Sequence, residues 1–350
     1  MTRRLRGLAL CLALATSVPA EAQGTRASSR TVSLDTVVGI QDYFEDAGAW
    51  KTQLIFDSFG TVEVAPRLQV SLRPVFWRSM TGEWNTHIYH ASLRYEFQKG
   101  SKWRVEAGKF PSPIGLGMTE NRASVNDGVV WWHRGYYSPL PSFGPGTARH
   151  SLMSSIYPVG MLVNTSGDRW DARAAFIDRA PVDFFNVDDA PRLGNSIVGG
   201  GISLRQGMRI GVAAAWGRSG DASVSEPYAL VNVEGEYAFG YTKISGEWTR
   251  DRFEMPTGDH VSHGWTLQAR QTLTPRVYVH SRVTVLESPA AIGTSGAFQD
   301  RTYRAVDTTV GYLVNAESTL RVGHAAMQRF SGPAIDHQIG VSIVWAKRWW

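Results

Sequence analysis

The chain has 350 residues, a formal net charge of +5 and one cysteine, Cys11. A single cysteine excludes a disulfide-stapled scaffold, and lysines and arginines scattered over the whole chain exclude a nucleic-acid-binding stripe. The chain contains 13 tryptophans, which suit a membrane interface. After residue 22, however, no apolar run approaches the roughly 18 residues that indicate a transmembrane helix. A membrane form would therefore be a closed β-barrel, because lipid leaves open strand edges unsatisfied.

The N-terminus, MTRRLRGLALCLALATSVPAEAQ, has the order of a secretory signal. Three arginines precede an apolar run from Leu8 to about Val18, and small residues follow up to Ala22. This order predicts a signal peptide at 1–22 and a single mature domain at 23–350. Cleavage would remove three arginines and one glutamate, which lowers the net charge from +5 to +3. It would also remove the only cysteine, so thiolate metal ligands and a cysteine nucleophile are excluded.

Alternation between apolar and polar residues recurs after the signal in runs of about 9 to 14 residues, the length of a tilted strand that crosses a bilayer. The runs lie near 32–43, 52–63, 67–78, 86–97, 102–110, 155–164, 169–179, 196–205, 208–218, 228–238, 241–252, 263–273, 276–286, 302–313, 318–329 and 337–348. We therefore predict an all-β fold, a transmembrane antiparallel up-and-down β-barrel of about 16 strands, with about 14 or 18 as alternatives.

Short and long connections alternate between these runs. Short turns are expected near 65–66, 99–100, 166–167, 206–207, 240, 274–275 and 315–316, and longer loops at 79–85, 111–154, 180–195, 219–227, 253–262, 287–301 and 330–336. Short turns at one end and long loops at the other are typical of outer-membrane barrels. The pattern predicts a protein of the cell outer membrane with both termini on the periplasmic side.

The two faces of each run differ in kind. In the hairpin Val231–Asp251, valines, Tyr237, Phe239 and Trp248 alternate with charged residues, and elsewhere glycines and alanines share the charged face. Small and charged residues suit the crowded interior of a barrel, so we expect the apolar face to contact outer-membrane lipid and lipopolysaccharide. Aromatic pairs near strand ends, such as Trp345 with Trp349, indicate interfacial girdles.

The last segment, IGVSIVWAKRWW, has the same alternation and ends in tryptophans. It resembles the terminal strand that outer-membrane proteins present to the barrel assembly machinery. The apolar alternation ends at Trp349, which leaves Trp350 one residue beyond the usual last aromatic.

Two stretches carry a family resemblance. GKFPSPIGLG, 108–117, and YPVGMLVN, 157–164, are similar to the strands that flank the long loop in porins of the phosphate-selective O/P type. The resemblance covers about 110–165 and implies a sixteen-stranded, often homotrimeric channel. It does not imply phosphate selectivity, because the lysine-rich anion cluster of that group has no counterpart here. We therefore expect a passive water-filled channel for small hydrophilic solutes.

The long loop supplies the first candidate site. In general porins the loop at this position folds inward and narrows the pore. Here it contains WWHRGYYSPLPSFGPG, and the side chains suited to contact a passing solute are Trp131, Trp132, His133, Arg134, Tyr136 and Tyr137. The alternative is that these rings only pack the loop against the barrel wall.

The second candidate site is a set of arginines on the charged face of the strands. Its members are Arg67, Arg73, Arg94, Arg104, Arg173, Arg209, Arg270 and Arg282. They outnumber the obvious carboxylates on that face, which favours a mild anion preference. The alternative is that each arginine forms an ion pair with a neighbouring strand.

An outer-membrane enzyme is the main alternative to a channel, and a purely structural barrel is the third. Asp188-Asp189 and Asp259-His260 lie in predicted extracellular loops, as acidic and Asp-His pairs do in omptin-type surface proteases, but both fit ordinary turns. His150-Ser151 would diverge on a strand and does not suit a phospholipase.

No metal or cofactor site is expected. The chain has no HExxH motif and no glycine-rich phosphate loop. In the run 86–97 strict alternation places Tyr89 outward with Ala91 and Leu93. The same alternation puts His87 and His90 on opposite faces, so they are not expected to share a metal ion.

Overall fold

The structure is a computed structural model of the whole chain. It describes residues 32–45, 50–79, 81–97, 102–116, 122–129, 140, 151–152, 157–183, 194–220, 225–255, 258–288, 302–329 and 334–349. The predicted signal peptide lies outside these residues. Within them, no helix has the length and apolar character needed to cross a bilayer.

Sixteen strands account for most of the described residues. They are β1 (Val32–Glu45), β2 (Trp50–Ala65), β3 (Leu68–Arg78), β4 (Trp84–Glu96), β5 (Trp103–Lys109), β6 (Val159–Ser166), β7 (Trp170–Ile177), β8 (Asn195–Arg205), β9 (Met208–Gly220), β10 (Ser225–Phe239), β11 (Thr242–Met255), β12 (Gly258–Thr274), β13 (Val277–Glu287), β14 (Thr302–Leu313), β15 (Ser318–Gln328) and β16 (Ile335–Arg348).

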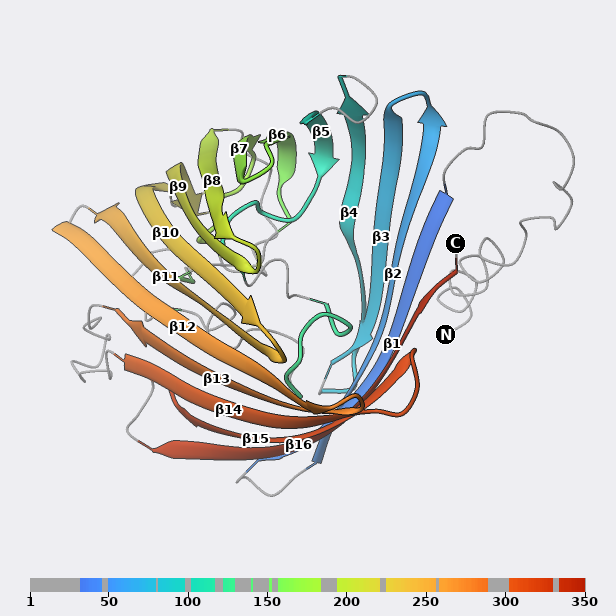
Figure 1. Cartoon of the computed structure of the whole chain (residues 1–350). Coiled ribbons are helices and arrows are strands. Elements are labelled where there is room, and N and C mark those ends of the chain that lie inside the picture. Colours follow the sequence, from blue (N-terminus) through green and yellow to red (C-terminus); the bar gives the residue numbers. More distant parts are fainter. Residues whose placement is uncertain are drawn as a thin grey trace, which may run out of the picture. The chain divides into compact units, whose positions relative to one another are not determined.

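Each strand pairs with its neighbours in the sequence, and β1 also pairs with β16, which closes the barrel (Figure 1). The β1–β16 contact is antiparallel, and its register runs from Asp35 opposite Arg348 to Glu45 opposite Gln338. The predicted fold class and the predicted number of strands are therefore confirmed. Because the ring is closed, it has no free strand edge.

Connections differ at the two ends of the barrel. At one end the strands turn within a few residues, as at 206–207 and 240–241; at the other end lie the connections 110–158, 178–194 and 288–301. We call these the short-turn end and the long-loop end. The first residue of β1 and the last residue of β16 both lie at the short-turn end.

The hairpin of β10 and β11 shows which face is outside. Val231 and Val233 are 43% and 40% exposed, whereas the alternating residues Asn232 and Glu234 are 0% and 4% exposed. Trp248, opposite Val233, also lies outward. The apolar face is thus the outer surface of the barrel and the polar face lines its interior, as predicted.

Strand β4 departs from the predicted alternation. Arg73 pairs with His90 and Pro74 with Ile88, so Tyr89 is an extra residue in β4. This β-bulge turns Tyr89 inward, where its ring stacks on that of Tyr157 at 4.3 Å. The prediction that Tyr89 faces outward is wrong, because the shift occurs next to a proline that cannot donate to the ladder.

The same bulge brings His87 and His90 to the inner face, so the prediction of opposite faces is also wrong. Their partners differ: His90 Nε2 lies 2.7 Å from Glu106 Oε1, and the His87 ring stacks on Tyr89 at 5.9 Å. The two histidines are on one side of the sheet with separate contacts.

Aromatic side chains gather near the short turns, as expected for an interfacial girdle. Tyr237 and Phe239 lie with ring centroids 4.9 Å apart, and Trp345 and Trp349 lie 6.2 Å apart. The indole Nε1 of Trp349 donates to Thr36 Oγ1 at 3.2 Å. These rings combine an apolar surface with a polar edge, which suits a boundary between hydrocarbon and water.

Val212 on β9 tests the orientation of the faces. Its side chain is 54% exposed on the outer surface, well inside the strand. We expect Val212→Arg to lower the free energy of unfolding in lipid vesicles by about 2–4 kcal/mol, because a charge near the bilayer midplane is costly. The change in the free energy of unfolding is measured by denaturant titration, with tryptophan fluorescence as the signal. Val212→Leu is the control, and an equal stability of the two variants would contradict the orientation.

Candidate pore constriction

The connection between β5 and β6 leaves the wall and enters the barrel. Lys109 ends β5, and Pro111 and Pro113 follow, which lack the amide donors that a strand ladder needs. The described parts of this connection, 110–116 and 122–129, are called the inserted segment. Figure 1 shows it in teal inside the ring of strands. The long loop of this chain therefore folds into the barrel interior over these residues.

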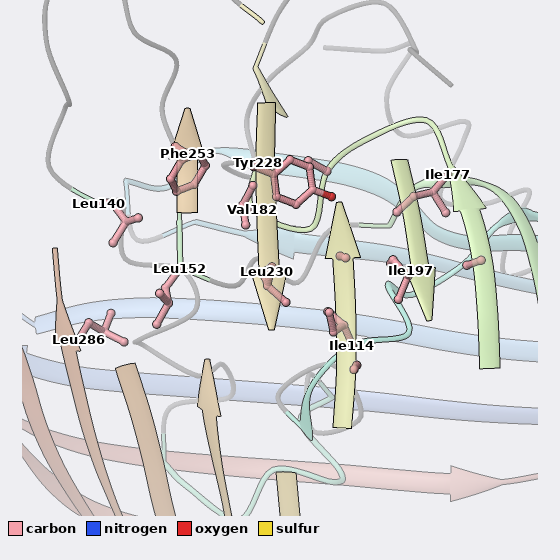
Figure 2. Close-up of a cluster of buried hydrophobic side chains, with 14 of the residues drawn as sticks. Ile114, Leu140, Leu152, Ile177, Val182, Ile197, Tyr228, Leu230, Phe253 and Leu286 are labelled. Carbon is pink, nitrogen blue, oxygen red and sulfur yellow. The ribbon is translucent and has the colours of Figure 1, made fainter. Parts of the chain in front are cut away.

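An apolar cluster holds the first part of the inserted segment. Phe110 and Ile114 are 0% and 1% exposed, and each such side chain contributes about 1.5–3 kcal/mol when it is fully buried. Figure 2 shows Ile114 in the same cluster as Ile197 and Leu230 of the wall. Other members are Leu140, Leu152, Leu162, Ala175, Ile177, Ala180, Val182, Ala213, Ala215, Tyr228, Phe253, Leu286, Tyr303, Ala305, Ala325 and Met327. This part of the interior is packed.

Polar contacts fix the segment further along. The backbone N–H of Leu116 donates to Glu247 Oε2 on β11 at 2.8 Å. Arg122 Nε then donates to Asp57 Oδ2 on β2 at 3.2 Å, on a different part of the ring. The inserted segment therefore makes its successive contacts on separate strands of the barrel.

Asp57 is the carboxylate that binds Arg122 of the inserted segment. Its side chain is fully buried, and Arg73 on β3 donates to both of its oxygens at 2.9 and 2.7 Å. The Arg73 guanidinium also lies over the rings of Tyr89 and Tyr157, at 5.6 and 5.9 Å from their centroids. The guanidiniums of Arg73 and Arg122 thus compensate the charge of this buried carboxylate. Without such partners, burial of the carboxylate would be strongly unfavourable.

Residues 127–129 are held by the wall formed by β12 to β16. Arg270 Nη1 lies 3.4 Å from Asp127 Oδ1, and Arg321 Nη1 donates to the carbonyl oxygen of Gly128 at 3.3 Å. The backbone N–H of Val129 donates to Thr309 Oγ1 at 3.0 Å. Most of these contacts are to backbone atoms, so they fix the path of the chain itself.

Two glycines make room for Val129. A Cβ at Gly340 would lie 2.5 Å from Val129 Cγ1, and a Cβ at Gly323 would lie 2.8 Å from Val129 Cγ2. Real Cβ atoms do not approach so closely, so the valine occupies a hollow that only glycine leaves open. The fit fixes the position of the segment against β15 and β16.

The interior beside this contact is polar. A small pocket there is lined by Val129, Arg282, Asp307 and Gln338, among others. In β1, β2 and β16 a row of three buried polar residues, Gln41, Gln53 and Ser342, has side-chain atoms without hydrogen-bond partners among the residues that the structure describes. Buried polar groups of this kind are usually satisfied by water.

Five of the eight predicted arginines lie in ion pairs with carboxylates. Arg73 and Arg270 pair as described above, and Arg282 Nη2 lies 3.3 Å from Asp307 Oδ2. The other two are Arg173 and Arg209. The interior charges are therefore largely compensated.

The pair of Arg173 and Arg209 belongs to a network on β7, β9 and β10. Arg209 donates to both oxygens of Asp171 at 3.0 Å and to Glu234 Oε1 at 2.6 Å. Arg173 Nη2 lies 3.5 Å from the same Glu234 oxygen. Two cations and two anions thus interact on the inner face of β7, β9 and β10, across the intervening β8, and link these strands.

The remaining predicted arginines are placed differently. Arg94 and Arg104 are half-buried on the inner faces of β4 and β5, and neither has an ion pair within 4.0 Å among the described residues. Arg67 lies in the β2–β3 turn with φ 70°, is exposed, and donates to the carbonyl oxygen of Phe97 at 2.8 Å. It is thus at the rim of the barrel, because alternation does not continue through a turn.

Sequence analysis missed Arg122 and Arg321. Arg321 is 3% exposed and donates to Tyr278 Oη at 3.0 Å. Arg321 lies between the apolar residues Leu320 and Val322, so the alternation along this strand could have predicted that its side chain points inward. No local pattern marked Arg122, because its partner is 65 residues away.

The aromatic residues predicted to contact solutes, Trp131 to Tyr137, lie outside the described residues, as do Asp188, Asp189 and His150. Asp259 accepts from Arg252 at 2.6 Å in an exposed ion pair, and the neighbouring His260 lies opposite the inward-facing Phe253. Across the described strands and loops there is no group of three or more His, Cys, Asp or Glu residues that suits a metal ion.

Comparisons with known proteins agree on the fold. No protein-family model and no curated protein matches the chain. Solved structures do match: OmpT of Vibrio cholerae in its trimer form has a TM-score of 0.59 and 11% identity, covering 91% of this chain and 99% of that chain. The anion-selective porin from Comamonas acidovorans has a TM-score of 0.58 and 12% identity, covering 91% and 100%.

A third match is OmpF of Salmonella typhi in complex with daunomycin, with a TM-score of 0.58 and 10% identity, covering 91% of this chain and 98% of that chain. At this level of identity the likeness concerns the fold. The chain thus has the sixteen-stranded barrel fold of bacterial outer-membrane porins, and nothing in these matches points to the phosphate-selective O/P type in particular.

Proposed function

We propose that the chain is an outer-membrane porin, a passive water-filled channel through which small hydrophilic solutes diffuse. The observation that carries the proposal is the inserted segment, which spans the interior of a closed barrel from Glu247 to Asp57 and on to Thr309. A barrel with an apolar outer surface and a polar, partly obstructed interior restricts passage by size.

The proposed passage is narrow. The apolar cluster closes the interior where Phe110 and Ile114 pack, so water and solutes are expected to pass where the wall is polar. The pocket beside Val129 and the row of Gln41, Gln53 and Ser342 mark this polar part of the interior. The aromatic residues Trp131, Trp132, His133, Arg134, Tyr136 and Tyr137 remain proposed solute contacts of the same loop.

Selectivity is proposed to be weak, with a mild preference for anions. Five of the predicted arginines are neutralised by carboxylates, so that of this set Arg94 and Arg104 face the interior without an ion pair among the described residues. Two such charges favour anions only slightly in a water-filled lumen, where the dielectric constant is high. The local resemblance of 110–165 to O/P-type porins concerns the strands that flank the long loop. It supports the place of this loop in the barrel, and we do not propose phosphate as the solute.

Assembly and location follow from the same proposal. The long-loop end would be extracellular, the short-turn end periplasmic, and residues 1–22 a signal peptide. OmpT of Vibrio cholerae has a trimer form, and we propose a homotrimer here as well. Lipid and lipopolysaccharide would surround the outer surface, and the barrel assembly machinery would insert it.

A surface protease is less well supported. The proposed base, His260, would act with Asp259, but Asp259 is held in an ion pair by Arg252 on the outer side of the rim. A general base needs its partner within hydrogen-bonding reach on the same side of the sheet. We therefore propose no enzymatic activity.

Removing the polar anchors of the inserted segment should open the channel. We expect Arg122→Ala with Asp127→Ala to raise the single-channel conductance by a factor on the order of two, because a displaced segment enlarges the open cross-section. Asp57 keeps its pair with Arg73 in this variant, so no buried charge is left alone. Planar-bilayer recording of the purified protein measures the conductance.

A disulfide provides the control for this experiment. With Val129→Cys and Gly340→Cys added to the same variant, oxidation should return the conductance to the wild-type value, and reduction should raise it again. A Cβ at Gly340 would be 2.5 Å from Val129 Cγ1, so side chains at these two positions are in direct contact. Absence of any conductance in the wild-type protein would overturn the porin proposal.

Charge reversal tests selectivity. We expect Arg94→Glu with Arg104→Glu to raise the permeability ratio of K⁺ to Cl⁻ about two- to fivefold, since the change in ion energy is ~0.5–1 kcal/mol at high dielectric. The reversal potential across a KCl gradient gives the ratio. Arg67→Glu, at the exposed rim, is the control and should change the ratio less. An unchanged ratio in the double variant would remove these two residues from the proposal.

A further inference from the structure

Two histidines from neighbouring strands lie in contact on the outer surface of the barrel. His324 on β15 and His337 on β16 are both exposed. His324 lies opposite Ile339, and His337 lies opposite Ala326, so the two imidazoles meet diagonally across the strand pair. Their ring centroids are 5.3 Å apart and their planes differ by 22°.

The distance between two of the ring nitrogens suits a metal ion. Nε2 of His324 lies 3.1 Å from Nδ1 of His337. Bonds of about 2.05 Å place two imidazole nitrogens ~3.3 Å apart on a tetrahedral zinc ion. Neighbouring nitrogens in a square-planar Cu²⁺ or Ni²⁺ site with similar bonds are ~2.9 Å apart. The observed distance lies between these values.

At this distance the two facing nitrogens repel each other unless a proton or a metal ion lies between them. Two neutral imidazoles at this distance share one proton, which one nitrogen donates and the other accepts. When a metal ion binds, the proton of the donating nitrogen moves to the other nitrogen of the same ring, so that both facing nitrogens present lone pairs to the metal. The strand pairing fixes both backbones, so only the side-chain torsions have to adjust.

We propose that His324 and His337 form a binding site for one divalent d-block metal ion, with Cu²⁺ bound more tightly than Ni²⁺ or Zn²⁺, as the Irving–Williams order requires. The protein supplies two nitrogen ligands, and water completes the coordination. Hard cations such as Mg²⁺ and Ca²⁺, which prefer oxygen ligands, do not compete for the site.

The position of the pair makes it accessible from the long-loop end. His337 is the third residue of β16, and the neighbouring Asp336 pairs with Arg329 at 2.9 Å, just beyond the end of β15. In the proposed orientation this is the extracellular boundary of the membrane. Only this last point depends on the porin proposal, because the two-nitrogen site itself is a property of the β15–β16 surface.

Copper titration of the tag-free, folded full chain in detergent micelles tests the proposal. We expect one tightly bound Cu²⁺ per chain with an electron paramagnetic resonance signal from two nitrogen ligands. His324→Gln and His337→Gln should each abolish that signal and weaken binding at least about tenfold, because one ligand no longer brings the metal to the other. Heat-modifiable gel migration checks that each variant is folded.

His263→Gln is the matched control. His263 is exposed on the outer face of β12 and pairs with Glu287 at 3.1 Å, so its loss should leave the tight site unchanged. Independently of any variant, saturating Zn²⁺ should protect His324 and His337, but not His263, from diethyl pyrocarbonate. A single-nitrogen signal in the wild type, or tight binding retained in both pair variants, would overturn the proposal, whatever the channel conducts.

Discussion

The closure of the backbone hydrogen-bond ring is the constraint on which the rest of the structure depends. β1 pairs with β2 on one side and with β16 on the other, so every strand has two partners and no edge remains. In such a ring the side-chain period of two leaves each residue only two environments. The valines and Trp248 take the outer one and Asn232 the inner one, which is the reverse of a soluble sandwich.

Closure also creates an interior that has to be filled, and the chain fills it in two ways. Around Ile114 the filling is apolar and shape-dependent. Around Asp57 and Asp127 it is ionic, with each carboxylate held by a guanidinium. The inserted segment passes from the first kind of environment to the second, so its position depends both on packing and on charge pairing.

Alternation predicted the strands because it is a local property. The run 302–313 matches β14 at both ends, whereas 263–273 is shorter than Gly258–Thr274 because its polar first residues resemble a loop. Contacts that depend on register were beyond the sequence. Arg209 meets Asp171 at a separation of 38 residues, and Arg122 meets Asp57 at 65. The motif before Pro111 indicated where the segment begins, but not what it would contact.

The extra residue in β4 has a consequence for changes in chain length. Because Tyr89 has no partner of its own in β3, its deletion would bring His90 and Ile88 into continuous register without turning Leu93 or Tyr95. β13 and β14 pair without any such interruption, and there the same deletion would invert every side chain that follows. Strand β4 can therefore lose one residue at this position without changing which of its later side chains face outward.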